Sequence, residues 1–419
     1  MKILFVFLAS LICQIAWAKT YIRADAYVEV KSGKTIGNAI IVVEDGRIES
    51  TKGNLNDAGP DDEVIDLAGK TLMPGLFDMH VHLIGNKLLK GAARVQESDQ
   101  LALLAGVENA RKLLMAGVTT VRSLGSSSYG DIALRDGIKA GYVIGPRVFA
   151  SGPALGITGG HCDNNWMPRE RDIRNAGVAN GPWEVAAKVR ENIKFGSDVI
   201  KFCATGGVMS KGTKVGVQQY TLEEMQTLVS EAHRRGLIVA AHAHGTSGIK
   251  DAIRAGVDSV EHASYIDDEG IQLAVENGTY LSMDIYVTEY ILGQGIADGI
   301  PEENIAKERT VGKIQRSNFT KAVEAGVKMV MGTDAGVYPG FADSPKQLSR
   351  MVTFGMTPAQ ALQAATINAA TLLKKQDEMG SLEEGKLADI IAVAGNPLED
   401  ISLLEDVTFV MKEGRVYKR

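Results

Sequence analysis

The sequence predicts an α/β protein, a (β/α)8 TIM-like barrel joined to a small β-sandwich domain formed from both termini. The middle of the chain alternates short apolar strands with amphipathic helices, and eight such units favour a closed parallel barrel over an open sheet. Both ends carry short strands separated by glycine turns. With 419 residues, of which 45% are hydrophobic, the chain is long enough for a barrel and an accessory domain.

The first 18 residues have the pattern of a secretory signal peptide. Lys2 supplies the positive charge, an apolar run follows, and a small-x-small ending precedes Lys19. We therefore expect cleavage after Ala18 and an exported protein, periplasmic or secreted. The alternatives are a buried first strand or an uncleaved anchor. No other run approaches the length of a membrane span, so we expect no membrane association after cleavage.

The two ends predict one β-sandwich domain, built from residues 19–73 and 380–419. Residues 38–50 have the pattern of a β-hairpin, in which an apolar run, an Asp-Gly turn and a second strand follow one another. A similar Glu-Gly turn returns close to the C-terminus. The barrel is then expected to occupy residues 74–379 without interruption.

The barrel prediction rests on eight apolar segments, each compatible with a buried parallel strand. Amphipathic helical patterns precede most of them, for example at residues 101–117, 182–196 and 221–236. In chain order, the strand-like segments are residues 75–83, 117–125, 146–155, 197–207, 237–245, 257–264, 279–287 and 327–336.

The histidines are concentrated where a barrel places its active site. Of the seven histidines, only His233 lies in the middle of a predicted helix, where a solvated or half-packed role is expected. The other six fall on predicted strands or in the loops that follow them, which form the active-site face of such a barrel. These six are His80, His82, His161, His242, His244 and His262.

Spacing brings some of these histidines together. Residues two apart on a strand point to the same side, so His80 and His82 share one space, as do His242 and His244. A single barrel histidine is most simply a hydrogen-bonded core residue. Several imidazoles buried together without a common partner would be costly, and a metal ion removes that cost. Imidazole ligands suit several metals, so the set does not name the ion.

Two further residues support a metal site. Asp334 ends the eighth predicted strand, where a carboxylate can bind metal and transfer protons. Lys201 is a charge in the middle of an apolar strand. It could reach solvent or pair with an acid, or its amine could be modified, because burial disfavours the ammonium form.

The order His-x-His, Lys, His, His, Asp along eight strands resembles the amidohydrolase superfamily. Residues 72–82, LMPGLFDMHVH, are similar to its first-strand signature, and the resemblance covers nearly the whole mature chain. It implies two divalent metal ions, with zinc the expected metal, and a lysine carboxylated by CO2. His80, His82 and Asp334 would hold one ion, His242 and His262 the other, and carboxylated Lys201 both.

Within that superfamily the chain looks most like metallo-dipeptidases related to imidazolonepropionase, namely prolidase-like enzymes and Xaa-Arg or Xaa-Lys carboxypeptidases. Deaminases and imidazolonepropionase usually lack the lysine and carry a glutamate shortly after the fifth-strand histidine. Here Lys201 is present, and Ala243-His244-Gly245 follows His242. These departures favour hydrolysis of a dipeptide or N-acyl amino acid that releases a C-terminal residue such as Pro, Arg or Lys.

The resemblance also suggests roles for individual residues. Asp334 would transfer the proton, and His244 would contact the substrate and stabilise the developing oxyanion, although geometry alone permits either His242 or His244 as the ligand. His161 would contact the substrate, unless it is an ordinary loop residue. Asp163 or Asp343 could read a basic side chain; exposed loop carboxylates are the equal alternative.

Other enzyme classes remain alternatives, namely a lactonase, a deaminase or an imidazolone-type hydrolase, and so does a non-enzymatic binding protein. The net charge of −6 is spread along the chain without a basic stripe, so we expect a small-molecule substrate and no nucleic acid. A homo-oligomer is compatible with the resemblance. Cys162 and Cys203 remain after cleavage, and two free thiols are expected over a disulfide.

Overall fold

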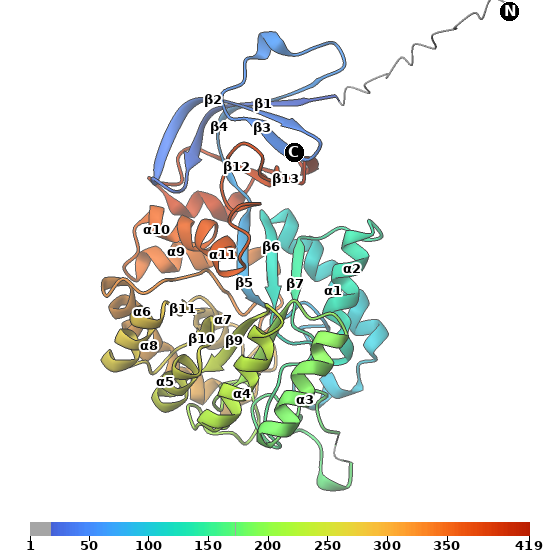
Figure 1. Cartoon of the computed structure of the whole chain (residues 1–419), viewed down its shortest axis with the longest axis vertical. Helices are drawn as coiled ribbons and strands as arrows, with labels where there is room; N and C mark the ends of the chain where they lie inside the picture. The colour runs from blue at the N-terminus through green and yellow to red at the C-terminus, as the bar shows by residue number, and fades with distance from the viewer. Residues whose placement is uncertain (1–17, 172) are drawn as a thin grey trace, which may run out of the picture.

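The structure is a computed structural model that describes residues 18–171 and 173–419. The predicted signal peptide therefore lies almost wholly outside the described residues. Figure 1 shows strands from both ends of the chain, blue and red, lying side by side at one end of the molecule, with the α/β core below them. None of the described helices combines the length and the apolar character needed to cross a bilayer.

The two ends of the chain share one sheet of seven strands in the order β14-β13-β12-β4-β1-β2-β3. β1 and β4 pair in parallel, and the other neighbours are antiparallel. The strands are β1 (Thr20–Glu29), β2 (Lys34–Glu44), β3 (Arg47–Ser50), β4 (Glu63–Pro74), β12 (Ile390–Ala394), β13 (Phe409–Lys412) and β14 (Arg415–Lys418). This arrangement confirms a separate β domain built from both termini; its exact predicted limits stay a prediction.

Two glycine turns explain how the terminal strands meet. Asp45 and Gly46, between β2 and β3, both have positive φ (47° and 72°), as a tight hairpin turn requires. Glu413 and Gly414 repeat this geometry between β13 and β14, with φ of 50° and 76°. A Cβ on Gly46 would lie 2.9 Å from the Glu413 carbonyl oxygen, so only glycine lets the two turns approach so closely.

The α/β core is a closed ring of parallel strands. β5, β6 and β7 form one sheet, and β8, β9, β10 and β11 form another. A bridge between Leu155, in the segment after β7, and Phe202 of β8 joins the two sheets. The strands are β5 (Leu76–Val81), β6 (Val118–Ser123), β7 (Arg147–Ala150), β8 (Val199–Cys203), β9 (Ile238–Ala243), β10 (Ser259–His262) and β11 (Tyr280–Ser282).

The eighth predicted strand is an extended segment and not a regular strand. It closes the ring through isolated bridges, from Met329 to Leu281 and from Ala335 to Val81. Asp334, next to the Ala335 bridge, adopts a left-handed conformation (φ 53°). The barrel prediction is thus confirmed, and this distortion lies where the candidate site begins.

Helices surround the barrel. α4 begins with a capping box in which the Thr221 side chain and the Glu224 carboxylate satisfy each other's backbone N–H groups. α5 and α6 end at Gly256 and Gly278, both left-handed, as helix C-termini favour. The helices are α1 (Asp99–Met115), α2 (Gly130–Lys139), α3 (Gly181–Lys194), α4 (Leu222–His233), α5 (Thr246–Ala255), α6 (Asp268–Asn277), α7 (Val287–Gly293), α8 (Glu302–Glu324), α9 (Lys346–Thr353), α10 (Pro358–Ala364) and α11 (Ile367–Leu372).

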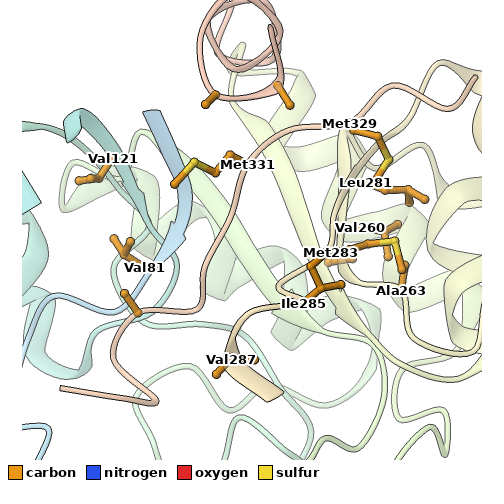
Figure 2. Close-up of a cluster of buried hydrophobic side chains, with 14 of the residues drawn as sticks. Val81, Val121, Val260, Ala263, Leu281, Met283, Ile285, Val287, Met329 and Met331 are labelled. Atoms are coloured by element: carbon orange, nitrogen blue, oxygen red, sulfur yellow. The ribbon is translucent and has the colours of Figure 1, made fainter. Parts of the chain in front are cut away.

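One large hydrophobic core fills the barrel and includes residues of the terminal sheet such as Val28, Met73 and Val393, and a second cluster consists mostly of other residues of the terminal sheet. Figure 2 shows part of the barrel core, in which side chains from β5, β6, β10 and β11 lie with Met329 and Met331 of the eighth segment. Among them, Val81, Val260, Leu281 and Met331 are fully buried. This packing fixes the strands on which the polar residues of the site alternate with apolar ones.

The two cysteines of the described chain form a disulfide. Cys162, in the loop after β7, is joined to Cys203 at the end of β8, with their Cα atoms 6.0 Å apart. The expectation of two free thiols is therefore wrong. The cysteines are 41 residues apart in the sequence, so only the barrel's closure of β7 against β8 brings them within reach.

Candidate metal centre and active site

The six histidines singled out from the sequence gather at the ends of the barrel strands. Five of them line one cavity of about 710 Å³ together with Lys201 and Asp334. His80 is buried at its base, within 3.5 Å of Asp334. His233, in contrast, is exposed on α4 and lies 2.8 Å from Asp258, consistent with the solvated role expected for it.

The first group of possible metal ligands consists of His80, His82 and Asp334, whose nearest ligand atoms lie within 4.8 Å of one another. The Asp334 Oδ1 atom is 3.5 Å from His80 Nε2 and 3.2 Å from His82 Nε2. Asp334 reaches this position because its backbone N–H donates to the His80 carbonyl oxygen at 2.8 Å. The three side chains thus present two imidazole nitrogens and a carboxylate to one point.

The second group consists of His242, His244 and His262, again with ligand atoms within 4.8 Å. His262 and Asp334 also belong to a third such group with Asp284, so the two histidine clusters adjoin. His244 Nδ1 is 2.8 Å from the Ser264 hydroxyl, whereas His242 Nε2 is buried and has no hydrogen-bond partner among the described residues. The unpaired Nε2 atom of His242 suits a metal ligand, and the geometry leaves His244 available for that role as well.

Lys201 lies on β8, is 3% exposed, and its Nζ atom has no hydrogen-bond partner within the described chain. Burial lowers the pKa of this amine to about 8. A buried ammonium without a partner is costly, so burial shifts this amine towards its neutral form. Together with the unpaired Asp334 Oδ1, these orphaned atoms fit a site that is completed by metal ions.

Carboxylates behind the histidines fix their orientation. The Glu261 carboxylate lies 3.3 Å from His80 Nδ1 and accepts a 2.7 Å hydrogen bond from Arg122. The charge of Arg122 and the contact with His80 keep the pKa of Glu261 below its ordinary value despite complete burial. Such a carboxylate–histidine pair is the usual support behind a metal-binding imidazole.

A second pair supports His262. Its Nδ1 atom lies 2.9 Å from Asp284, and Gln315 on α8 donates to the same Asp284 oxygen at 2.9 Å. Burial alone would lower the pKa of His262, yet the Asp284 carboxylate outweighs it and raises that pKa. Sequence reasoning missed Glu261, Arg122, Asp284 and Gln315. The first three had a usable signal, because charged residues interrupt otherwise apolar strands.

The protonation of three of the clustered imidazoles suits metal binding, and His262, whose pKa is raised, is the exception. Burial, helped by the charge of Lys201, lowers the pKa of His80 to about 4. Burial likewise lowers the pKa values of His242 and His244 well below the ordinary histidine value. A metal ligand must be neutral imidazole, so these side chains need lose no proton at neutral pH to bind an ion.

The backbone at the site adopts uncommon conformations. His262, Ala263 and Asp334 have positive φ values of 68°, 48° and 53°. Each such residue costs on the order of 1–3 kcal/mol, and such strain is typical of functional sites. Asp78 holds the strained segment, since its carboxylate accepts hydrogen bonds from the Thr333 N–H at 3.1 Å and the Thr333 hydroxyl at 2.6 Å.

His161 comes into the site from the loop after β7. Its ring stacks on that of His242, with centroids 4.0 Å apart, and its Nδ1 lies 2.8 Å from the Ser210 hydroxyl. The disulfide of the next residue, Cys162, anchors this loop to β8. His161 therefore lies close enough to act on a molecule bound in the cavity.

The two acids considered for a basic side chain have other contacts. Asp163 lines the cavity, but its carboxylate accepts hydrogen bonds from the backbone N–H groups of Gly159 and Asn175, at 2.8 and 3.1 Å. Asp343 is ion-paired to Lys346 at 2.8 Å and does not belong to the cavity lining. Neither position leaves a free carboxylate for a substrate.

The comparison with known proteins identifies the class. The model of the amidohydrolase family matches residues 71–417, which is most of the chain. The chain therefore belongs to the amidohydrolase family, as the order of its histidines, lysine and aspartate predicted.

Individual relatives are consistent with this class. The chain is similar to ochratoxinase from Aspergillus niger, with 36% identity over 371 residues, covering 83% of this chain and 75% of the relative. It is 25% identical over 395 residues to imidazolonepropionase from Streptococcus gordonii, covering 86% and 85%. Among solved structures it resembles a Xaa-Pro dipeptidase with methionine bound in the active site, with 40% identity, a TM-score of 0.91, and coverage of 96% and 100%. The family and these relatives identify a hydrolytic enzyme and support metal-dependent amide hydrolysis.

Proposed function

We propose that the protein is a binuclear metal-dependent dipeptidase, which cleaves the amide bond of dipeptides or N-acyl amino acids and releases a C-terminal amino acid. Proline, arginine and lysine are the candidate released residues. The observation that carries this proposal is the pair of adjoining ligand groups, which meet at His262 and Asp334. The similarity to a Xaa-Pro dipeptidase at 40% identity supports the dipeptide substrate.

The proposed ligands are those expected from the sequence. His80, His82 and Asp334 would hold one ion, His242 and His262 the other, and Lys201, carboxylated by CO2, would contact both. The unmet atoms Lys201 Nζ, His242 Nε2 and Asp334 Oδ1 support this assignment. When bound, divalent ions such as zinc act as Lewis acids and lower the pKa of coordinated water.

Two side chains of the chain would handle the substrate and its proton. Asp334, ionised at neutral pH, would accept a proton from the attacking water and deliver it to the leaving amine. Ser264 can donate its hydroxyl hydrogen to His244 Nδ1. The His244 Nε2–H would then be free to donate to the carbonyl oxygen as negative charge develops there.

Cationic residues in the cavity support a substrate with a free carboxylate. Lys87, Lys90 and Arg94, all from the segment after β5, line the cavity. Lys90 donates to the Val337 carbonyl oxygen at 2.9 Å, which holds its ammonium group at this wall, whereas burial lowers the pKa of Lys87 well below the ordinary lysine value and disfavours its charged form. A C-terminal α-carboxylate is the group of a dipeptide that such cations would bind.

The proposal is tested by elemental analysis and a substrate panel. Purified protein supplied with zinc and bicarbonate should contain about two metal ions per chain and hydrolyse some Xaa-Xaa dipeptides or N-acyl amino acids. The panel includes lactones, deaminase substrates and imidazolone-type heterocycles, which represent the other amidohydrolase activities. Turnover of one of those groups without any amide hydrolysis would contradict the proposal.

We further propose that the protein is exported and that cleavage leaves Lys19 as its first residue. The Cys162–Cys203 disulfide supports export, because disulfides persist mainly in oxidising compartments. N-terminal sequencing of the protein from the periplasmic or secreted fraction tests this directly. A cytoplasmic protein that retains Met1 would contradict it.

A further inference from the structure

The long helix α8 presents a row of buried residues to the active-site cavity. Asn304, Glu308, Val311 and Gln315 all line the cavity, and each is no more than 3% exposed. Their spacing of four, three and four residues puts them on one face of the helix. This face, called here the α8 wall, is polar at three of its four positions.

One end of the α8 wall touches the metal centre. Gln315 Nε2 donates to Asp284 Oδ1 at 2.9 Å and to the His262 carbonyl oxygen at 3.1 Å. Glu308 precedes Gln315 by seven residues, which places it about 10 Å further along the helix axis, since each helical residue rises about 1.5 Å. Glu308 thus lies well away from the reacting bond but inside the same cavity.

Glu308 is a buried carboxylate without a cationic partner in the described chain. Its Oε1 atom accepts a 2.5 Å hydrogen bond from the Thr288 hydroxyl, and none of the ion pairs among the described residues includes it. Burial therefore raises its pKa to about 7. Burying an acid without a compensating charge is unfavourable. The burial of Glu308 is explained if a ligand supplies that charge.

Asn304 provides a second unmet acceptor on the same wall. Its Nδ2 donates to the Val208 carbonyl oxygen, while its Oδ1 is buried and has no partner among the described residues. Asn304 precedes Glu308 by four residues, one helical turn, so both acceptors belong to one patch. A carboxylate and an amide oxygen together suit a cation that carries several N–H donors.

We propose that Glu308 and Asn304 form a specificity site for a basic side chain of the substrate, an ammonium or a guanidinium. The inference rests on the proposed dipeptidase function and deepens it. The position of Glu308, well away from the reacting bond, favours contact with a side-chain cation of the substrate over its N-terminal amine. The α-ammonium of a dipeptide lies only two bonds from the scissile carbonyl carbon. A lysine or arginine side chain has the long stem needed to reach along the wall.

The test compares Glu308→Gln with the wild type on Ala-Lys, Lys-Ala, Ala-Arg and Ala-norleucine. Glutamine can still accept the hydrogen bond from Thr288, so the fold is preserved while the charge is removed. Because a hydrogen bond to a charged group is worth about 1.5–3 kcal/mol, kcat/KM for the basic substrates should fall about 10- to 100-fold. Ala-norleucine, which lacks the cation, should change by less than about threefold on the same scale.

Glu302→Gln is the matched control, because Glu302 is an exposed acid on the same helix, paired with Arg309 at 2.7 Å. This variant should leave kcat/KM for all four substrates unchanged. The proposal is overturned if Glu308→Gln lowers kcat/KM equally on basic and neutral dipeptides. If Glu308→Gln loses as much kcat/KM on Ala-norleucine as on the basic dipeptides, but loses none on N-acetyl-norleucine, the cation at this site is the α-ammonium. That result would overturn the assignment to a side chain.

A binding measurement separates this inference from the proposed function. Isothermal titration of the zinc-loaded enzyme with L-arginine and L-citrulline needs no turnover. The wild type should bind arginine more tightly than its uncharged analogue, and Glu308→Gln should remove most of that difference. If this holds while no dipeptide is cleaved, only the dipeptidase proposal fails. Equal affinities in the wild type would overturn the specificity site itself.

Discussion

The Cys162–Cys203 disulfide offers a sharp test of how the loop after β7 is held in the active site. Both cysteines line the cavity, Cys162 follows His161, and Cys203 lies two residues beyond Lys201. The double variant Cys162→Ala/Cys203→Ala removes the link without burying a new polar group at Cys203, which is 1% exposed. We expect it to be less stable and to bind substrate less well.

The magnitude follows from the loop that the disulfide closes. The cysteines are separated by 41 residues, and the chain-entropy relation gives about 4 kcal/mol of stabilisation for a loop of that length. A loss of this size is a large part of the free energy of unfolding of an ordinary domain, so it should be readily measured. The urea midpoint should fall, and the slope should rise, because the unfolded chain without the link is less compact and exposes more surface.

The assay is equilibrium urea unfolding of the wild type and the double variant, each with and without dithiothreitol. Reductant should lower the wild-type midpoint to that of the double variant and leave the double variant itself unchanged. In kinetics, KM should rise more than kcat falls, because the substrate-contacting His161 loses its anchor beside His242 while the proposed metal ligands keep their positions. A wild-type midpoint that stays constant after thiol titration has verified complete reduction would refute the reasoning.

Three further predictions concern the centre and the pH response. Asp334→Asn should keep bound metal yet lose about 10²- to 10⁴-fold in kcat, the usual contribution of a proton-transferring group. Lys201→Ala should lower the metal content from about two ions per chain, measured by elemental analysis. Burial raises the pKa of Asp131 to about 7, above its unfolded value, so its contribution to stability is full below about pH 4 and is lost as the pH rises towards 7. Asp131→Asn should therefore lose less stability than the wild type between pH 5 and 8 in thermal unfolding.

Each of these predictions has a clear contrary result. Near-normal kcat in Asp334→Asn would remove its role in proton transfer. A content of two metal ions per chain in Lys201→Ala would exclude a bridging role for Lys201. For Asp131, identical pH profiles of the melting temperature in variant and wild type would show that its protonation does not couple to folding.

Local pattern was sufficient for the fold and for the residues that resemble known ligands. Histidines two residues apart on a strand-like segment, such as His80 and His82, share a face because the side chains of a strand alternate with a period of two. The Asp45-Gly46 turn likewise follows from local backbone preference. These features depend on neighbours in the sequence, so the sequence alone can predict them.

The roles of the supporting residues were not predictable in this way, although charges within apolar segments marked three of them. Glu261, Arg122 and Asp284 acquire their meaning from partners on other strands, and Glu308 from its place on a helix wall that faces the cavity. Asp163 was considered for substrate binding, yet backbone N–H groups occupy its carboxylate. Its loop conformation, invisible in the residue pattern, decided this.

The sequence by itself determined the barrel, the terminal β domain and the residues that gather at the candidate metal centre, because periodicity and turn chemistry act over a few neighbouring positions. Tertiary structure alone decided that Cys162 meets Cys203, that Asp284 stands behind His262, and that Glu308 lies in the cavity with no cationic partner among the described residues. Each of these depends on closing the ring of strands, which brings residues distant in sequence within contact distance. Local pattern thus identifies the residues of the candidate centre, while the contacts around them depend on the closed barrel.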